Sequence, residues 1–173
     1  MAVREAVESL LAANPDAAIV VMGDFNDNFD DASLIEGLRS VPSRETFLAD
    51  PDAGLLLNLH AGLPEAVRKS FYYRSGKIWN SLDSMHVTRS MVSGTTQPTW
   101  KIISDSYEVL RWERLLDEWG HPKAFRRITN PDTKARYFQY GYSDHLPVRL
   151  ELRLHTIGGK IGKPPIRRGG ENK

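Results

Sequence analysis

The stretch AAIVVMGDFNDN, residues 17–28, decides the fold, because six apolar residues run directly into a glycine and a group of polar side chains. A short apolar run bounded by turn-forming residues is typical of a buried strand, which we expect to be covered on both faces. Gly23 allows the backbone to turn at the end of this strand. Asp24 and Asn26 are two residues apart, so on an extended segment their side chains point the same way, while Phe25 points into the core.

A carboxylate and a carboxamide at a strand end have two interpretations. Asp24 and Asn26 can bind a hard cation, a phosphate oxygen or a water. Asp, Asn and Gly are also common in turns that have no ligand. The stretch alone leaves both open.

The composition is that of one soluble globular domain. The chain has 173 residues, of which 40% are hydrophobic and 26% charged, enough to build a core. It has no cysteine, which excludes a disulfide framework and thiolate metal sites. No window approaches the roughly 18 apolar residues that cross a bilayer, and the N-terminus lacks a signal-peptide layout. We therefore expect no transmembrane segment, and the cellular compartment stays undetermined.

Charge divides the chain into two parts. Residues 1–155 carry 18 basic and 21 acidic side chains, whereas residues 156–173 carry five basic and one acidic. This composition predicts a folded domain over 1–155 and a disordered basic tail over 156–173. The domain is not strongly basic, so composition alone does not indicate a nucleic-acid binder.

Apolar spacing and turn residues predict the remaining elements. The expected helices are residues 3–11, ended by Asn14-Pro15; 32–38, capped by Asp30 or Asp31; 55–59; and 111–119. The expected strands are 70–74 and 78–88, joined at Ser75-Gly76; 99–103; and 146–154, in which leucine or valine alternates with polar residues. Residues 130–141 are expected to be a polar loop, and the last strand is expected to have one buried face.

Two further polar groups could carry chemistry. Asp144 and His145 stand directly before the last strand, where a carboxylate can hold a divalent metal and an imidazole can move a proton. Asp83 lies inside a predicted strand, where Asp is disfavoured. It is either exposed or buried with a donor such as His145, which would fix the imidazole tautomer. A capped turn and a solvent-facing Asp83 are the alternatives.

Taken together, the three groups resemble a known family. Gly-Asp-Phe-Asn at 23–26, Trp-x-x-Leu-Asp at 79–83 and Ser-Asp-His-Leu-Pro-Val at 143–148, in this order, are similar to motifs of the endonuclease/exonuclease/phosphatase superfamily. The hairpin before Asp83 also resembles bacterial members. The likeness runs from about Val3 to Leu154 and implies an α/β (α+β) fold, a mixed and mostly antiparallel sheet with flanking helices.

The resemblance also implies roles for individual residues. Asp24 would orient or activate the attacking water, Asn26 would contact the scissile phosphate, and Asp83 would hold His145, which hydrogen-bonds the phosphate or takes a proton. Asp144, together with Asp24 and Asn26, would hold Mg²⁺ or Mn²⁺. The partner would be a phosphate-ester substrate, whether nucleic acid, phospholipid or inositol phosphate.

The chain departs from the family pattern in length and at one position. Family members are four-layer sandwiches of about twice this length, with a metal-binding Glu in the N-terminal half. Only 23 residues precede Asp24, so we expect the chain to be the C-terminal half of such a sandwich. A fragment, a gene with a misplaced start and a decayed copy are the alternatives, and upstream sequence could supply the other half. Ser84 stands where many relatives carry a His, and we interpret the nearby His86 as an ordinary strand residue.

Several other residues are expected to have structural roles. The four tryptophans are expected in the core, and His60 and His121 in loops without partners. Tyr140, Tyr142, Arg126 and Arg127 could touch a substrate, although loop packing or solvation is the alternative.

Three functions therefore remain open. The first is a metal-dependent phosphoesterase that uses an activated water. The second is a non-catalytic remnant or interaction module built on half of the sandwich, which predicts an exposed apolar sheet face. The third is a nucleic-acid binder that uses the basic tail.

Overall fold

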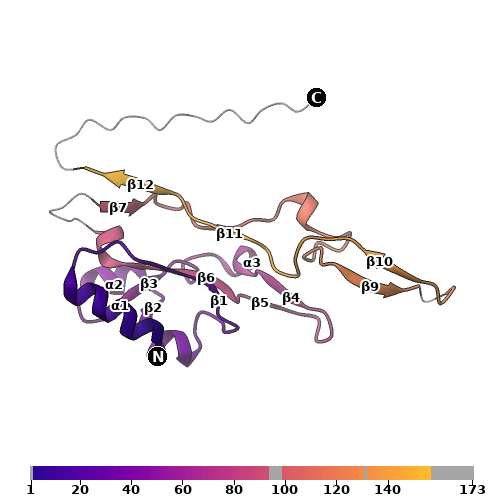
Figure 1. Cartoon of the computed structure of the whole chain (residues 1–173), viewed down its shortest axis with the longest axis horizontal. Coiled ribbons are helices and arrows are strands. Elements are labelled where there is room, and N and C mark those ends of the chain that lie inside the picture. Colours follow the sequence, from indigo (N-terminus) through magenta and orange to yellow (C-terminus); the bar gives the residue numbers. More distant parts are fainter. Residues whose placement is uncertain (1, 94–98, 131, 157–173) are drawn as a thin grey trace.

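A four-stranded sheet forms the centre of the computed structural model, which describes residues 2–93, 99–130 and 132–156 (Figure 1). Its strand order is β1 (Val20–Asp24), β6 (Asp83–Thr88), β3 (Leu56–Asn58) and β2 (Ser40–Val41). β6 is antiparallel to both β1 and β3, whereas β2 is parallel to β3. The mixed, mostly antiparallel sheet confirms the predicted α/β class.

The sheet is buried on both faces at β3. Leu56 and Leu57 are both buried, and because successive strand residues point to opposite faces, they enter different cores. Leu56 packs with Val7 of helix α1 (Ala2–Ala13), and Leu57 packs with Phe47 of helix α2 (Arg44–Ala49). Each core is small, and together they fix the position of the sheet between its helices.

The helix expected over 3–11 is confirmed as α1, but the others differ. Residues 55–59 contain strand β3 instead of a helix. Residues 32–38 form a π turn, η1 (Ser33–Gly37), without a side-chain cap, and Asp31 accepts the backbone N–H of Asn28 instead. Two helices were not expected: α2, capped by the Ser43 hydroxyl, and α3 (Glu65–Arg68).

The predicted helix over 111–119 is wrong. Only a 3₁₀ turn forms there, η3 (Glu113–Leu115), because Asp117 accepts the N–H groups of Trp119 and His121 and so competes with helix formation. Trp119 is 63% exposed, and Trp100 and Trp112 are also exposed, so these three tryptophans are not in the core.

The first predicted hairpin is present but its second strand is divided. β4 (Phe71–Tyr73) pairs with β5 (Ile78–Asn80), and the chain then breaks and continues as β6 in the central sheet. Asp83 therefore begins a strand instead of lying inside one.

Residues expected to be a polar loop form part of a second hairpin. β9 (Arg126–Thr129) pairs with β10 (Arg136–Gln139), and this hairpin projects from the body of the protein (Figure 1).

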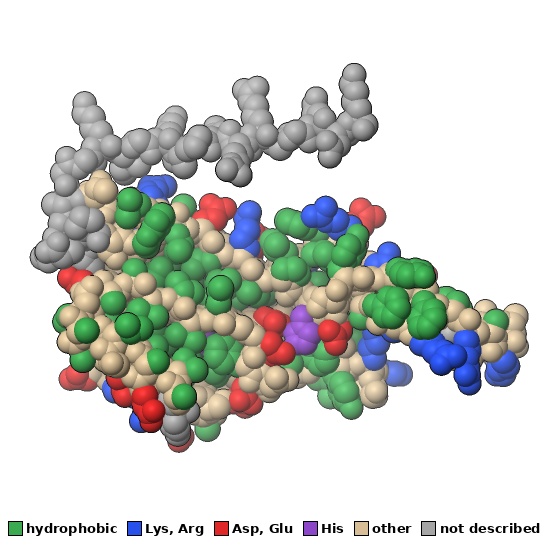
Figure 2. Space-filling view, in the orientation of Figure 1, with side chains coloured by type: hydrophobic (Ala, Val, Ile, Leu, Met, Phe, Trp, Pro, Cys, Tyr) green, Lys and Arg blue, Asp and Glu red, His purple; other side chains and the backbone are tan. Residues whose placement is uncertain are grey.

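The last predicted strand is divided into two short ones with little burial. The strand predicted over 99–103 is present as β7 (Thr99–Ile102). It pairs with β12 (Leu152–His155), and β8 (Glu108–Val109) pairs with β11 (Val148–Arg149). Leu152 and Leu154 are exposed, so the expected buried face is wrong for β12. Met22 in β1 is 66% exposed, so this strand is not covered on both faces either. Figure 2 shows hydrophobic side chains over much of the visible surface.

Two expectations concern the ends of the chain and the membrane. The predicted basic tail lies outside the described residues, apart from Thr156. Within the described part of the chain, no helix has the length and apolar character of a membrane span.

Candidate active site

The site begins where β1 and β6 meet at the end of their ladder. Asp24 and Asp83 are directly opposite each other as the last pair of the register. Opposite residues on an antiparallel pair have their Cβ atoms about 5 Å apart on the same face. Two carboxylates from segments 59 positions apart in sequence are therefore brought together by backbone pairing.

A third segment brings His145 to the same place. The backbone N–H of Leu146 donates to the carbonyl of Ser70 at 2.7 Å, and an isolated bridge joins Phe71 to His145. Leu146 is fully buried, which anchors the segment from below. The phenyl ring of Phe71 stacks on the imidazole with 4.6 Å between ring centroids.

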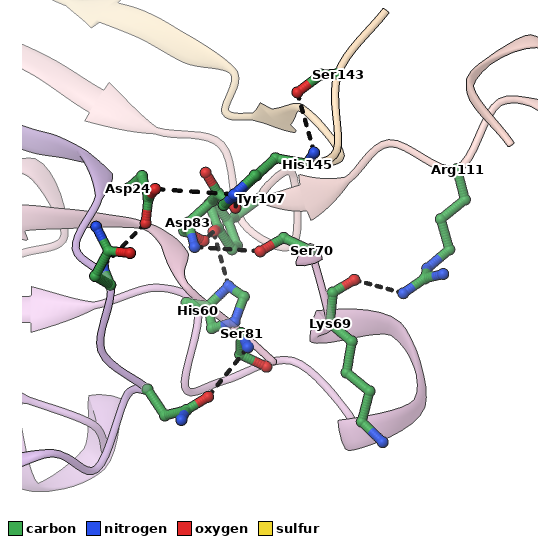
Figure 3. Close-up of polar contacts among 12 residues, drawn as sticks. Asp24, His60, Lys69, Ser70, Ser81, Asp83, Tyr107, Arg111, Ser143 and His145 are labelled. Carbon is green, nitrogen blue, oxygen red and sulfur yellow. Dashed lines mark hydrogen bonds and ion pairs between the residues drawn. The ribbon is translucent and has the colours of Figure 1, made fainter. Parts of the chain in front are cut away.

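The imidazole of His145 lies between the two carboxylates (Figure 3). Its Nδ1 is 2.7 Å from Oδ2 of Asp83, and its Nε2 is 3.9 Å from Oδ2 of Asp24. An ionised carboxylate can only accept a hydrogen bond, so Nδ1 of His145 is protonated and donates a hydrogen bond to Asp83. In the neutral ring Nε2 is then the basic nitrogen, and it faces Asp24.

Asp83 is itself held by several neighbours. Its backbone N–H donates to the Ser70 hydroxyl at 3.2 Å, and its carbonyl accepts the Tyr107 hydroxyl at 3.3 Å. Burial raises the pKa of Tyr107, and the charge of Asp83 adds to this rise. The Ser143 hydroxyl accepts the N–H of His145 at 3.0 Å. Both halves of the Asp83–His145 pair are thus fixed by backbone contacts.

Asp24 and Asn26 do not lie on one extended segment as expected. The Asp24 carboxylate accepts the N–H of Asn26 at 2.9 Å, and Asn26 has a φ of 54°, a left-handed conformation that Asn tolerates better than most residues. The turn therefore occurs at Asn26 and not at Gly23, which lies within β1 opposite Ser84. Phe25 packs toward the core, as predicted.

The acidic groups differ in how they could serve a cation. Asp24, Asp83 and His145 each offer a ligand atom within 4.8 Å of the others. Asp144 is exposed and does not belong to this group. Carboxylate and carboxamide oxygens without thiolates suit a hard divalent cation.

A buried histidine, His86, supports the site from within the core. His86 lies in β6, as expected, with Nδ1 2.6 Å from the Ser40 hydroxyl and Nε2 2.8 Å from the Ser84 hydroxyl. Its ring meets that of Phe25 edge to face, so it braces the turn between Asp24 and Asn26. Burial lowers the pKa of His86 to about 4.

The expectation that His60 and His121 lack partners is wrong. The Nδ1 of His60 is 3.0 Å from the Tyr107 hydroxyl, and burial lowers the pKa of His60 to about 4. The His121 ring stacks on Tyr72 with 3.7 Å between centroids.

Three site residues escaped the sequence interpretation: Ser70, Phe71 and Tyr107. The sequence pattern predicts only a strand for Ser70 and Phe71, and it predicts no element for Tyr107. The available signal for both residues is their position at the start of the hairpin that leads to Asp83. No local pattern marks Tyr107, which reaches the site from 24 positions away.

The comparison with known families agrees with the geometry. The family model described as "Endonuclease/Exonuclease/phosphatase family" matches residues 1–154. The chain belongs to this family, which makes a phosphoesterase-type hydrolase its functional class. Searches of the curated proteins and of the solved structures gave no match.

Proposed function

We propose that the chain hydrolyses phosphate esters by attack of a water that is activated between Asp24 and His145. The observation that carries this proposal is the imidazole of His145 held between two carboxylates from separate segments, one at 2.7 Å and the other at 3.9 Å. The longer distance is beyond hydrogen-bonding range, so Asp24 and Nε2 stay available to a third molecule.

Each side chain has a role that follows from its position. Asp83 fixes the tautomer and orientation of His145 and stabilises the protonated ring. His145 moves a proton at Nε2. Asp24, which is exposed at the end of β1, orients the water. Asn26 follows it in the turn and is exposed, so its carboxamide can contact the phosphate.

A divalent cation, Mg²⁺ or Mn²⁺, fits the oxygen donors at this rim. Asp24 would hold it together with Asn26 and Asp144, whose exposed side chains flank Asp24 and His145 in sequence. Such an ion supplies charge neutralisation for the phosphoryl oxygens, which phosphoryl transfer needs more than covalent chemistry.

Hydrolysis of bis(p-nitrophenyl) phosphate with Mn²⁺ or Mg²⁺ tests the proposal. His145→Ala is expected to slow turnover by roughly 10²- to 10⁴-fold. His155→Ala is the matched control, because His155 is an exposed histidine in β12. Equal rates for His145→Ala and wild type, or no metal-dependent turnover by the wild-type chain, would contradict the proposal.

A non-catalytic interaction module is the second candidate, favoured by the exposed apolar side chains of β1 and β12. Met22, Leu152 and Leu154 are all exposed, and apolar patches of this kind often mark contact surfaces. This candidate predicts that the chain binds a hydrophobic dye and self-associates in sedimentation experiments while showing no turnover.

A further inference from the structure

The projecting β9–β10 hairpin differs in charge from the rest of the domain. Residues 123–142, which we name the arm, contain five basic side chains and one acidic, whereas the rest of residues 1–155 contains 13 basic and 20 acidic. Figure 2 shows Lys and Arg side chains toward the end of the arm and hydrophobic side chains nearer the body. A positive element on a negative domain attracts an anionic partner to one place.

One face of the arm combines arginines with aromatic rings. Arg127 is opposite Phe138 in the ladder, and Arg136 is opposite Thr129. Opposite and alternate residues share a face, so both arginines and Phe138 lie on the same side. Phe125 stacks on Phe138 with 5.5 Å between ring centroids, and Tyr140 meets Phe125 edge to face at 5.7 Å.

The aromatic rings of this face are exposed, and its two arginine side chains are available to a ligand. Phe125, Phe138 and Tyr140 are 60%, 53% and 76% exposed. Among the described residues, no ion pair or side-chain hydrogen bond involves Arg127 or Arg136. Arg126 provides the contrast, since its side chain donates to Gln139 and lies near Asp117. The arginine on one face of the arm, Arg126, is therefore held by protein groups, whereas Arg127 and Arg136 on the other face are available to a ligand.

We propose that the face formed by Phe125, Arg127, Arg136, Phe138 and Tyr140 binds a single strand of nucleic acid. This inference rests on the proposed function and names the substrate class of the same site. Bases stack on exposed aromatic rings whatever their sequence, while arginine guanidinium groups pair with the phosphates. A ring cluster flanked by two available arginines supplies both contacts on one surface.

The arm leads directly into the candidate active site. His145 is six positions after Gln139, the last residue of β10, and six residues of extended chain span at most about 20 Å. A strand held on the arm can therefore present a phosphodiester to His145 a few nucleotides away. Tyr142, the last residue of the arm, is exposed and offers a further stacking surface on the way to His145.

The tip of the arm argues against a lipid membrane as the partner. Asn130, Asp132, Thr133 and Lys134 are the polar residues of the turn, and the aromatic rings lie toward the base. An amphipathic element on a membrane surface keeps its apolar face apart from its basic face, whereas Arg127, Arg136 and Phe138 share one face of the arm.

Fluorescence anisotropy with a labelled 12-nucleotide single-stranded DNA, in EDTA to prevent cleavage, tests the proposal on the full chain. The double variant Arg127→Gln/Arg136→Gln is expected to bind at least tenfold more weakly and to reduce the slope of log affinity against log salt by about 1.4. Phe138→Ala is expected to weaken binding about tenfold with little change in slope.

The matched control is Arg44→Gln/Arg153→Gln, which removes two exposed arginines at the other end of the molecule. Its affinity is expected to equal that of the wild type, and thermal melting checks that every variant is folded. Equal affinity of the two double variants, loss of binding only on removal of residues 156–173, or arm-dependent binding to phosphatidylserine vesicles but not to DNA would overturn the proposal.

Turnover of bis(p-nitrophenyl) phosphate separates this inference from the proposed function. This small ester does not need the arm, so the arm variants are expected to hydrolyse it at wild-type rates. Arm-dependent DNA binding without any hydrolysis would refute the proposed function and leave the arm's partner established. Hydrolysis without arm-dependent binding would do the reverse.

Discussion

The phenyl ring of Phe71 covers one face of the His145 imidazole, with 4.6 Å between ring centroids and an angle of 27° between the planes. Asp83 contacts only the Nδ1 edge of the imidazole, which leaves the ring free to rotate about that hydrogen bond. The stacked ring of Phe71 restricts this rotation and so fixes the direction of Nε2. A residue from a hairpin outside the central sheet thus helps to orient the proposed proton-transfer group.

Phe71→Leu is expected to lower kcat for bis(p-nitrophenyl) phosphate about tenfold, with little change in KM, since a mispositioned base affects chemistry more than binding. Tyr73→Leu in the same strand is the control, because Tyr73 is exposed and pairs with Ile78 at the opposite end of β4 from Phe71. A kcat for Phe71→Leu equal to that of Tyr73→Leu would show that stacking does not position the imidazole.

Removal of divalent metal with EDTA is expected to abolish turnover, and added Mn²⁺ to restore it. Asp24→Asn and Asp144→Asn are expected to weaken Mn²⁺ binding by calorimetry at least tenfold, because each removes a charged oxygen donor. Asp30→Asn, another exposed carboxylate, serves as the control. If Asp144→Asn binds Mn²⁺ as the control does, Asp144 is not a ligand.

Stability is expected to fall as the pH drops from 6.5 toward 4. His60 and His86 have pKa values of about 4 in the fold, against about 6.5 in an unfolded chain. The unfolded state therefore takes up more protons between these values, which destabilises the fold by about 2 kcal/mol per histidine at pH 5. Urea unfolding at pH 7.5 and pH 5 measures this loss.

His86→Asn is expected to be less stable at pH 7.5 but to lose less stability on acidification, because one of the two titrating groups is gone. His155→Asn, at an exposed histidine, should retain the full pH dependence. An unchanged pH dependence in His86→Asn would assign the acid sensitivity to other groups.

Gly141→Ala is expected to displace the arm from the body. A Cβ at position 141 would lie 1.9 Å from the carbonyl oxygen of Lys123, which also accepts the N–H of Tyr142 at 2.7 Å. Limited proteolysis should therefore cut the arm faster in this variant than in Gly37→Ala, where the nearest atom to an added Cβ is the carbonyl oxygen of Ala32 at 3.8 Å. The same cleavage rate in both would mean that this close approach does not secure the arm.

The sequence predicted the pair at the centre of the site better than its surroundings. Asp83 and His145 meet as one of the two interpretations of Asp83 required, because a carboxylate and an imidazole have complementary hydrogen-bonding chemistry that residue type alone reveals. The relation between Asp24 and Asn26 was not predictable from strand alternation, since the Asp24 carboxylate accepts the backbone N–H of Asn26 and the strand ends at Asp24.

The elements that failed had local patterns that tertiary contacts overrode. Residues 111–119 have helical apolar spacing, yet the Asp117 carboxylate accepts hydrogen bonds from backbone N–H groups. It also accepts one from the guanidinium of Arg74, in the β4–β5 hairpin, with 2.8 Å between nitrogen and oxygen. Burial opposes ionisation of Asp117, but this bond and the two backbone N–H groups outweigh it and lower its pKa. Leu152 and Leu154 alternate as in a half-buried strand, but among the described strands β12 pairs with β7 alone, and both leucines remain exposed.

At the base of the arm, the backbone N–H of Tyr142 donates a hydrogen bond to the carbonyl of Lys123. The segment between Lys123 and Tyr142 can be shortened, lengthened or exchanged for another hairpin, because the chain then still enters and leaves the domain at these two residues. The proposed recognition surface and the proposed catalytic centre are thereby separable modules, and grafting a different insert at this junction is a direct way to test whether the arm sets the class of ester.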